Sequence, residues 1–166
     1  MSFMFFKCRS LNELNLSNFK TDEVSDMNFM FFNCISLKEL NISTFNIKNV
    51  RDMSSMFKNC IKLEELDLSM PKYDFYLKMK SMFSGCVSLK KLNLSNLKPY
   101  FVGDMSYMFR NCISLQEINL TNLKQTDYCQ TFGMLGGCPR NYRLRATFAA
   151  YDLYLSEYEF SDCPEP

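Results

Sequence analysis

The sequence predicts an α/β solenoid, because one 26-residue pattern recurs along the chain without insertion or deletion. Methionine marks the period at Met1, Met27, Met53, Met79 and Met105, and cysteine keeps the same spacing at Cys8, Cys34, Cys60, Cys86, Cys112 and Cys138. Leucines that alternate with polar residues follow each of the first five of these cysteines. A unit this short cannot bury its apolar side alone, so successive units must stack.

Each of the first five units contains a leucine segment with the pattern LxxLxLS. It reads Leu11, Leu14, Leu16 and Ser17 in the first unit and recurs, with conservative changes, in the next four. Residues two apart point the same way in a strand, so this alternation predicts a short strand with Leu or Ile inward and polar residues outward. We expect these strands to form a short parallel β-sheet on the concave face of the solenoid.

A second segment, with the pattern MxxMFxxC, precedes each leucine segment. Its Met, Phe and Cys residues recur at spacings that fit one face of a helical turn, so we expect short helices or 3-10 turns on the side away from the sheet. Asp26, Asp52 and Asp104 stand just before this segment and are predicted helix N-caps. The Met, Phe and Cys columns are predicted to pack in the core.

The combined pattern MSxMFxxCxxLxxLxLS, read from Met53 to Ser69, resembles the repeats of BspA-like leucine-rich-repeat surface proteins. The resemblance covers residues 1–130. It implies a leucine-rich-repeat solenoid that acts as a non-catalytic protein-binding module, in adhesion or host interaction, at the cell surface or outside the cell. It does not identify the protein partner. The alternative is an intracellular or effector-type leucine-rich-repeat interaction scaffold, since the chain carries no signal peptide and its cysteines suit a reducing compartment.

The units divide the chain into two parts. Residues 1–138 are predicted to form the leucine-rich-repeat array, with five full units and a degenerate sixth, and residues 139–166 an irregular C-terminal cap. The chain begins inside a unit, so its uncapped N-terminal end is expected to dock further repeats or a partner.

Composition excludes several functions. The chain has no histidine, which removes Ser-His-Asp, Cys-His and His-ligated zinc sites, and we expect no catalytic residues and no cofactor. A formal charge of +1 argues against nucleic acid as a partner. No apolar run approaches the roughly 20 residues of a membrane-spanning segment.

The cysteine column has three readings. Reduced core thiols are favoured, because equivalent side chains in one column run parallel, and no metal ligation is expected. Disulfides along the column remain an alternative, since stacked units bring the Cα atoms within bridging distance. Cys129 and Cys163 lie outside the column, and a bridge between them in an oxidising compartment is the alternative to two free thiols.

The outward strand positions are the candidate ligand-binding residues on the concave face. They are Glu13, Asn15, Glu39, Asn41, Glu65, Asp67, Lys91, Asn93, Glu117 and Asn119. An ordinary solvated sheet face would also carry polar rows. The row of like-charged Glu residues costs stability unless Lys38 and Lys90, in the adjacent column, or a cationic partner offset the charge.

Overall fold

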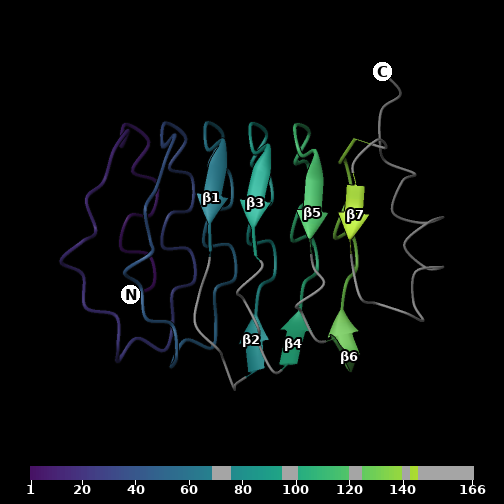
Figure 1. Cartoon of the computed structure of the whole chain (residues 1–166), viewed down its shortest axis with the longest axis horizontal. Coiled ribbons are helices and arrows are strands. Elements are labelled where there is room, and N and C mark those ends of the chain that lie inside the picture. The colour runs from purple at the N-terminus through teal and green to yellow at the C-terminus, as the bar shows by residue number, and fades with distance from the viewer. Residues whose placement is uncertain (69–75, 95–100, 120–124, 140–142, 146–166) are drawn as a thin grey trace.

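The computed structural model describes residues 1–68, 76–94, 101–119, 125–139 and 143–145. Successive units lie side by side and form a single stack from the N-terminal unit to strand β7 (Figure 1). The hydrophobic core is one continuous cluster that runs through the stack. The prediction of a solenoid is therefore confirmed for the described part of the chain.

The larger sheet contains the predicted strands. Its members are β1 (Glu65–Asp67), β3 (Lys91–Asn93), β5 (Glu117–Asn119) and β7 (Arg143–Arg145). They pair in parallel in the order β1-β3-β5-β7, and equivalent residues such as Leu66 and Leu92 face each other. Strand β7 lies inside the range 139–166 that was assigned to a cap. Residues 146–166 lie outside the described residues, so the domain boundary stays a prediction.

The leucine segments of the first two units are not strands. Residues 13–16 and 38–42 have no strand pairing, which corrects the prediction for these two units. In the paired strands the sign of the charge alternates from unit to unit: Glu65 lies opposite Lys91, and Lys91 lies opposite Glu117. The same position carries glutamate in each of the first three units, and like charges directly opposite each other weaken strand pairing.

A second parallel sheet, which the sequence did not predict, lies before the MxxMFxxC segments. Its strands are β2 (Tyr76–Lys78), β4 (Phe101–Asp104) and β6 (Gln125–Gln130), in the order β2-β4-β6. Single bridges from Asp26 to Asp52 and from Asp52 to Lys78 continue it toward the N-terminus. The register shifts between β2 and β4, where Gly103 is an extra residue opposite Leu77 and Lys78. A side chain at Gly103 would collide with the Tyr76 ring.

The MxxMFxxC segments form turns, so the prediction of short helices on this side is wrong for the described residues. Every second N–H in a segment donates to the neighbouring unit, as Phe31 does to the Met56 carbonyl at 2.9 Å. The N–H groups between them close local turns, such as Cys34 to the Phe31 carbonyl at 3.1 Å. In an α-helix, N–H groups beyond the first turn bond to the carbonyl four residues earlier in the same segment, and these N–H groups do not. We call the layer of stacked segments the turn layer.

Two positions in each segment have the left-handed backbone conformation. In the second unit these are Phe29, with φ 54°, and Asn33, with φ 59°. The position equivalent to Asn33 is occupied along the chain by Lys7, Asn33, Asn59, Gly85, Asn111 and Gly137. Asparagine and glycine tolerate this conformation best, so the column carries a sequence signal for a turn that the helical spacing concealed.

The aspartates predicted as N-caps fix the start of each turn segment instead. The Oδ1 atom of Asp26 accepts a hydrogen bond from the Asn28 N–H at 2.8 Å, and Asp52 and Asp104 repeat the contact two residues on. This is the bond of an Asx turn. The residue type was read correctly as a capping group, but the element that it caps is a turn.

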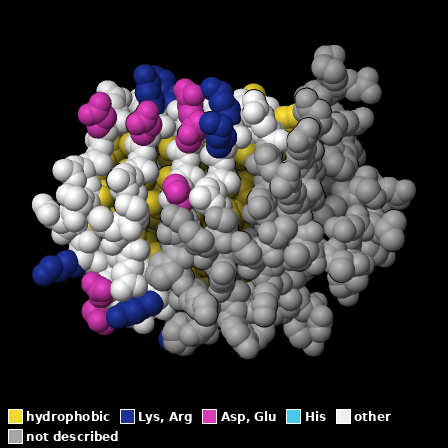
Figure 2. All heavy atoms as spheres, viewed as in Figure 1, with side chains coloured by type: hydrophobic (Ala, Val, Ile, Leu, Met, Phe, Trp, Pro, Cys, Tyr) yellow, Lys and Arg dark blue, Asp and Glu magenta, His cyan; other side chains and the backbone are white. Residues whose placement is uncertain are grey.

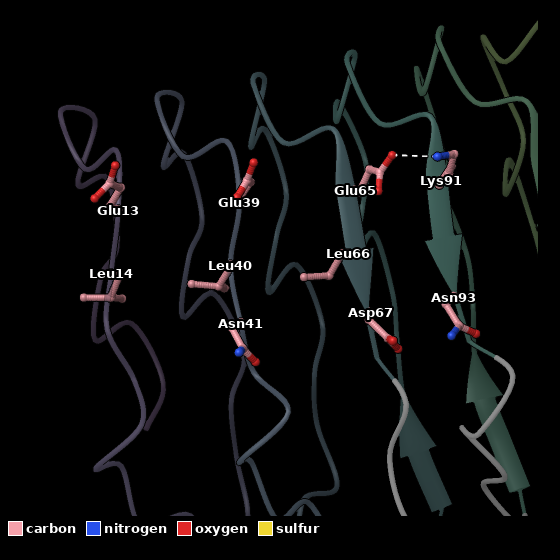
Figure 3. A pocket seen from close by; sticks show the side chains of 10 residues that line it. All are labelled: Glu13, Leu14, Glu39, Leu40, Asn41, Glu65, Leu66, Asp67, Lys91 and Asn93. Carbon is pink, nitrogen blue, oxygen red and sulfur yellow. Dashed lines mark hydrogen bonds and ion pairs between the residues drawn. The ribbon is translucent and has the colours of Figure 1, made fainter.

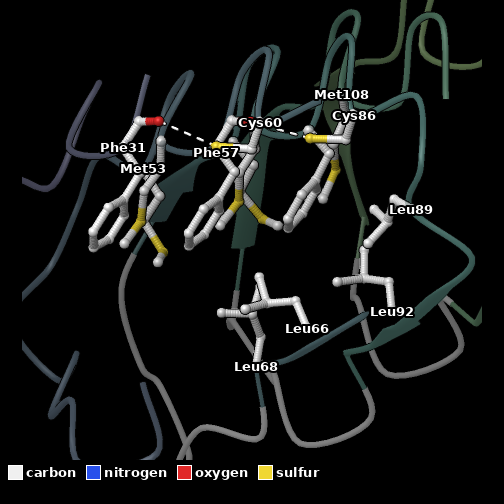
Figure 4. Packing of buried hydrophobic residues seen from close by; sticks show 14 of the residues in the cluster. Phe31, Met53, Phe57, Cys60, Leu66, Leu68, Cys86, Leu89, Leu92 and Met108 are labelled. Atoms are coloured by element: carbon white, nitrogen blue, oxygen red, sulfur yellow. Dashed lines mark hydrogen bonds between the residues drawn. The ribbon is translucent and has the colours of Figure 1, made fainter. Parts of the chain in front are cut away.

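Like side chains stack on like in the core. Phe31, Phe57, Phe83 and Phe109 are fully buried, and their rings stack nearly parallel, with centroids 5.4 to 5.8 Å apart. The methionine and cysteine columns are buried with them from Met27 onward (Figure 4). The prediction of core packing is confirmed, except in the first unit, where Met4 is 49% exposed.

Replacing Asn33 tests the left-handed column. Asn33→Gly is expected to leave the free energy of unfolding nearly unchanged, whereas Asn33→Val should lower it by about 1 to 2 kcal/mol, because a β-branched residue strongly disfavours a φ of 59°. Urea unfolding measures both. Lys58→Val is the control, at a half-exposed site in the same layer without positive φ. Equal effects of Val at both sites would count against backbone strain.

Candidate functional site

The outward residues of the leucine segments line a groove of about 600 Å³ (Figure 3). Its lining residues are Glu13, Leu14, Glu39, Leu40, Asn41, Glu65, Leu66, Asp67, Lys91 and Asn93. One row runs from Glu13 to Lys91 and a second from Asn41 to Asn93, with a row of leucines between them. The structure thus brings together seven of the ten candidate residues along one surface.

The other three candidates are placed differently. Asn15 is exposed but does not line the groove. Glu117 and Asn119 belong to β5, but their side chains lie outside the described residues. Leu14, Leu40 and Leu66 line the groove although sequence reasoning assigned them to the core alone. Leu14 is partly exposed, whereas Leu40 and Leu66 are 8% and 4% exposed, so they form a narrow apolar floor and otherwise belong to the core.

Charge is distributed unevenly along the groove. Glu65 Oε1 and Lys91 Nζ form an ion pair at 2.9 Å, and the carboxylate raises the Lys91 pKa. Among the residues that the structure describes, neither Glu13 nor Glu39 has an ion-pair partner. The N-terminal half of the groove is therefore acidic. Figure 2 shows acidic side chains gathered along this edge of the face, with basic ones beside them.

Lys90 does not offset the glutamate row as expected. Its Nζ atom pairs with Glu64 Oε2 at 2.8 Å, in the adjacent column, and this hydrogen bond lowers the Glu64 pKa. Lys38 contributes a smaller electrostatic effect on the same carboxylate. Among the described side chains, the cation that pairs within the Glu row is Lys91, which bonds Glu65.

The asparagine row has a structural role as well. The Oδ1 atoms of Asn15 and Asn41 accept hydrogen bonds from the N–H groups of Ser17 and Ser43, each at 3.0 Å. These bonds close a turn at the end of the leucine segment. The Oδ1 atoms of Asn15 and Asn41 are thus used inside the chain.

The cysteine column forms a ladder of free thiols in the described residues. Each Sγ from Cys34 onward donates to a Phe carbonyl of the preceding unit, such as Cys60 to Phe31 at 3.1 Å and Cys86 to Phe57 at 3.1 Å (Figure 4). Burial, then the neighbouring thiol, raises the pKa of Cys34 from 9.0 to about 11. Burial is also the main cause that raises the pKa values of Cys60, Cys86 and Cys112 well above 9.0.

This environment makes the ladder chemically inert, because the thiolate is the reactive form and burial opposes it. The side chains of Cys129 and Cys163 lie outside the described residues, so their redox state stays a prediction. Within the described ranges, no three His, Cys, Asp or Glu residues form a group able to hold a metal ion. The same ranges contain no helix with the length and apolar character needed to cross a membrane.

Comparison with known protein families assigns the 26-residue repeats to a family. Residues 1–74 and 72–141 each match the family described as "Mycoplasma protein of unknown function, DUF285". The chain belongs to this family. The match spans the array of 26-residue units, whereas the narrower resemblance to BspA-like proteins stays a prediction. The DUF285 description assigns no activity.

Two further comparisons, with curated proteins and with solved structures, give no additional assignment. No curated protein matches the chain. A solved structure of a leucine-rich repeat protein from Bacteroides ovatus is similar to this DUF285 chain at 20% identity and a TM-score of 0.39. The alignment covers 90% of this chain and 43% of that one, so the chain spans less than half the length of that protein.

Thiol labelling tests the ladder. In a Cys129→Ser, Cys163→Ser background, the exposed Cys8 is expected to react promptly with Ellman's reagent in the native protein. Cys34, Cys60, Cys86, Cys112 and Cys138 should react only after denaturation, because all five are buried. Prompt native labelling of the whole set would contradict the packing.

Stability should fall as pH rises above about 9. The unfolded chain releases the thiol protons near 9.0, whereas the folded chain retains them up to about 11 at Cys34 and higher at Cys60. Over that window the unfolded state binds fewer protons, so each of the thiols of Cys34, Cys60, Cys86 and Cys112 lowers the free energy of unfolding by about 1.4 kcal/mol per pH unit.

Urea unfolding between about pH 8 and pH 11 measures this slope. Cys60→Ser is the matched control, because serine keeps a donor for the Phe31 carbonyl but does not titrate in this range. The variant should lose stability less steeply than the wild type. Parallel slopes would mean that the thiols are not the titrating groups.

Proposed function

We propose that this chain is a non-catalytic protein-binding module that acts in adhesion or host interaction at the cell surface, and that its groove contacts the partner. The observation that carries the proposal is the groove itself, which joins an apolar floor to two polar rows. Leucine surface beside directed polar groups is the composition of a protein-binding site. The resemblance to BspA-like surface proteins supports a location at the cell surface.

The unpaired glutamates favour a partner that brings Lys or Arg side chains. Glu13 and Glu39 line the same edge of the groove, and a cation placed between them would offset the repulsion between the two carboxylates. Acid-base catalysis is disfavoured, because it needs two groups in different environments and this row repeats one group in one setting.

The second candidate is an intracellular or effector-type interaction scaffold. The high cysteine content without a disulfide among the described cysteines favours it, because disulfides are rare in reducing compartments. Protease treatment of intact cells separates the two candidates. Degradation of the chain supports the surface address, whereas a protected chain that is cleaved only after lysis supports the scaffold.

Glu39→Lys separates binding from folding, because the two effects have opposite signs. The new lysine lies between Glu13 and Glu65, so the free energy of unfolding should rise by roughly 0.2 to 1 kcal/mol. Affinity for a basic partner should fall about tenfold or more. Biolayer interferometry on immobilised fibronectin, laminin and collagen measures binding, and urea unfolding measures stability.

Glu23→Lys is the charge-matched control, because Glu23 is exposed and does not line the groove. It should bind like the wild type. The proposal fails if the wild-type protein binds none of the three matrix proteins, or if Glu39→Lys and Glu23→Lys bind equally well.

A further inference from the structure

The turn layer has an outward face of its own. In the second to fifth MxxMFxxC segments the first, fourth, fifth and eighth residues are buried. The other four positions form the outward side, where most side chains are at least partly exposed and the small side chains of Ser55, Ser81, Ser84 and Ser106 are buried. In the second unit these outward residues are Asn28, Phe29, Phe32 and Asn33, all partly exposed. We call this surface the turn face. It lies across the core from the groove, because the two layers enclose the same hydrophobic cluster.

Four phenylalanines form an aromatic patch on the turn face. Phe3 stacks on Phe29 and Phe6 on Phe32, each pair with centroids 5.0 Å apart and interplanar angles of 6° and 14°. An edge contact between Phe3 and Phe6 at 5.4 Å and a tilted contact between Phe29 and Phe32 at 5.5 Å join the two pairs into one cluster. Phe29 and Phe32 have units on both sides and still remain partly exposed, so the patch opens sideways and not only at the end of the stack.

The charges on the turn face are all basic. At the outward positions of the six segments the charged residues are Lys7, Lys58, Lys80 and Arg110. No Asp or Glu occurs anywhere in these segments. The Lys7 ammonium lies 5.0 Å from the Phe6 ring centroid, and Lys58 follows Phe32 in the same column. The aromatic patch and the cations therefore form one continuous surface.

We propose that the turn face binds the surface of an anionic lipid bilayer. The aromatic patch can enter the boundary between headgroups and acyl chains, while lysine and arginine pair with lipid phosphate and carboxylate groups. Acidic groups would be repelled there, and this face has none. Nucleic acid fits less well, because the Phe rings already stack on one another and offer no open gap for a base.

Vesicle flotation tests the proposal directly. Wild-type protein is mixed with vesicles of phosphatidylcholine alone or of phosphatidylcholine with phosphatidylserine. Binding is expected only to the mixed vesicles and should weaken with added salt. Phe29→Ser with Phe32→Ser should reduce it about tenfold, through loss of buried aromatic surface. Lys58→Ser and Lys80→Ser should each lower the affinity for the mixed vesicles about fivefold.

These substitutions are compatible with the fold by the chain's own example. Serine occupies the equivalent positions in the fourth unit, as Ser81 and Ser84, and Ser81 has a φ of 54°, the same as Phe29. Ile113→Ser is the control, because Ile113 is 59% exposed but lies outside the turn face. Urea unfolding checks each variant. The chain contains no tryptophan, so Phe32→Trp supplies a single fluorescent reporter. On binding to vesicles its emission should shift to shorter wavelength and should be quenched by brominated lipid.

Each outcome decides the matter. Selective binding that the Phe and Lys variants weaken and Ile113→Ser does not, with quenching at Trp in position 32, supports a lipid surface. Wild-type protein that floats with neither vesicle, or a double Phe variant that floats as well as the wild type, overturns it. Light scattering that detects a dimer lost in the double Phe variant would assign the patch to a second copy instead, and the lipid proposal would fall.

Discussion

Hydrogen bonds between successive turn segments determine the rest of this structure. Each segment sends every second N–H to the carbonyl one residue before its own equivalent in the next unit, as Met27 does to Asp52 and Asn33 to Lys58, both at 2.9 Å. Such a ladder needs the same register at every step, which explains why the 26-residue period carries no insertion. It also requires left-handed residues at fixed points, since the chain must turn its N–H groups sideways without entering a helix.

The ladder stacks every residue on its equivalent, which has different consequences for different side chains. Phenyl rings and thiols gain from it, because identical shapes pack closely and each thiol finds a carbonyl in the preceding unit. Stacked carboxylates are destabilised, because like charges repel. The strands pair where Glu65, Lys91 and Glu117 alternate, and they do not pair where Glu13 and Glu39 repeat. The acidic half of the groove is thus the part of the sheet face that folding leaves unbalanced.

Much of this architecture could be predicted from the sequence, and the misses have physical causes. The period, the inward leucines and the core columns follow from spacing alone. The turn layer was mistaken for helix because spacings of three, four and seven suit both, and only the Asn and Gly residues in the Asn33 column separate them. The second sheet was missed because its strands, Tyr76–Lys78, Phe101–Asp104 and Gln125–Gln130, share no repeated apolar and polar pattern. Seven groove residues were foreseen, but the pairing of Glu64 with Lys90 depends on side-chain geometry that no spacing specifies.

A repeat protein offers an internal comparison that separates the needs of folding from those of binding. Core columns hardly vary between units, because each side chain must fit the same cavity. At the outward positions of the turn face the backbone is equally constant, yet the side chains change from phenylalanine in the first two units to Ser55 and Lys58 in the third. Folding therefore does not require Phe29 or Phe32. The partial exposure of four phenyl rings costs free energy that the fold does not recover. Burial of these rings against a surface outside the chain would recover it.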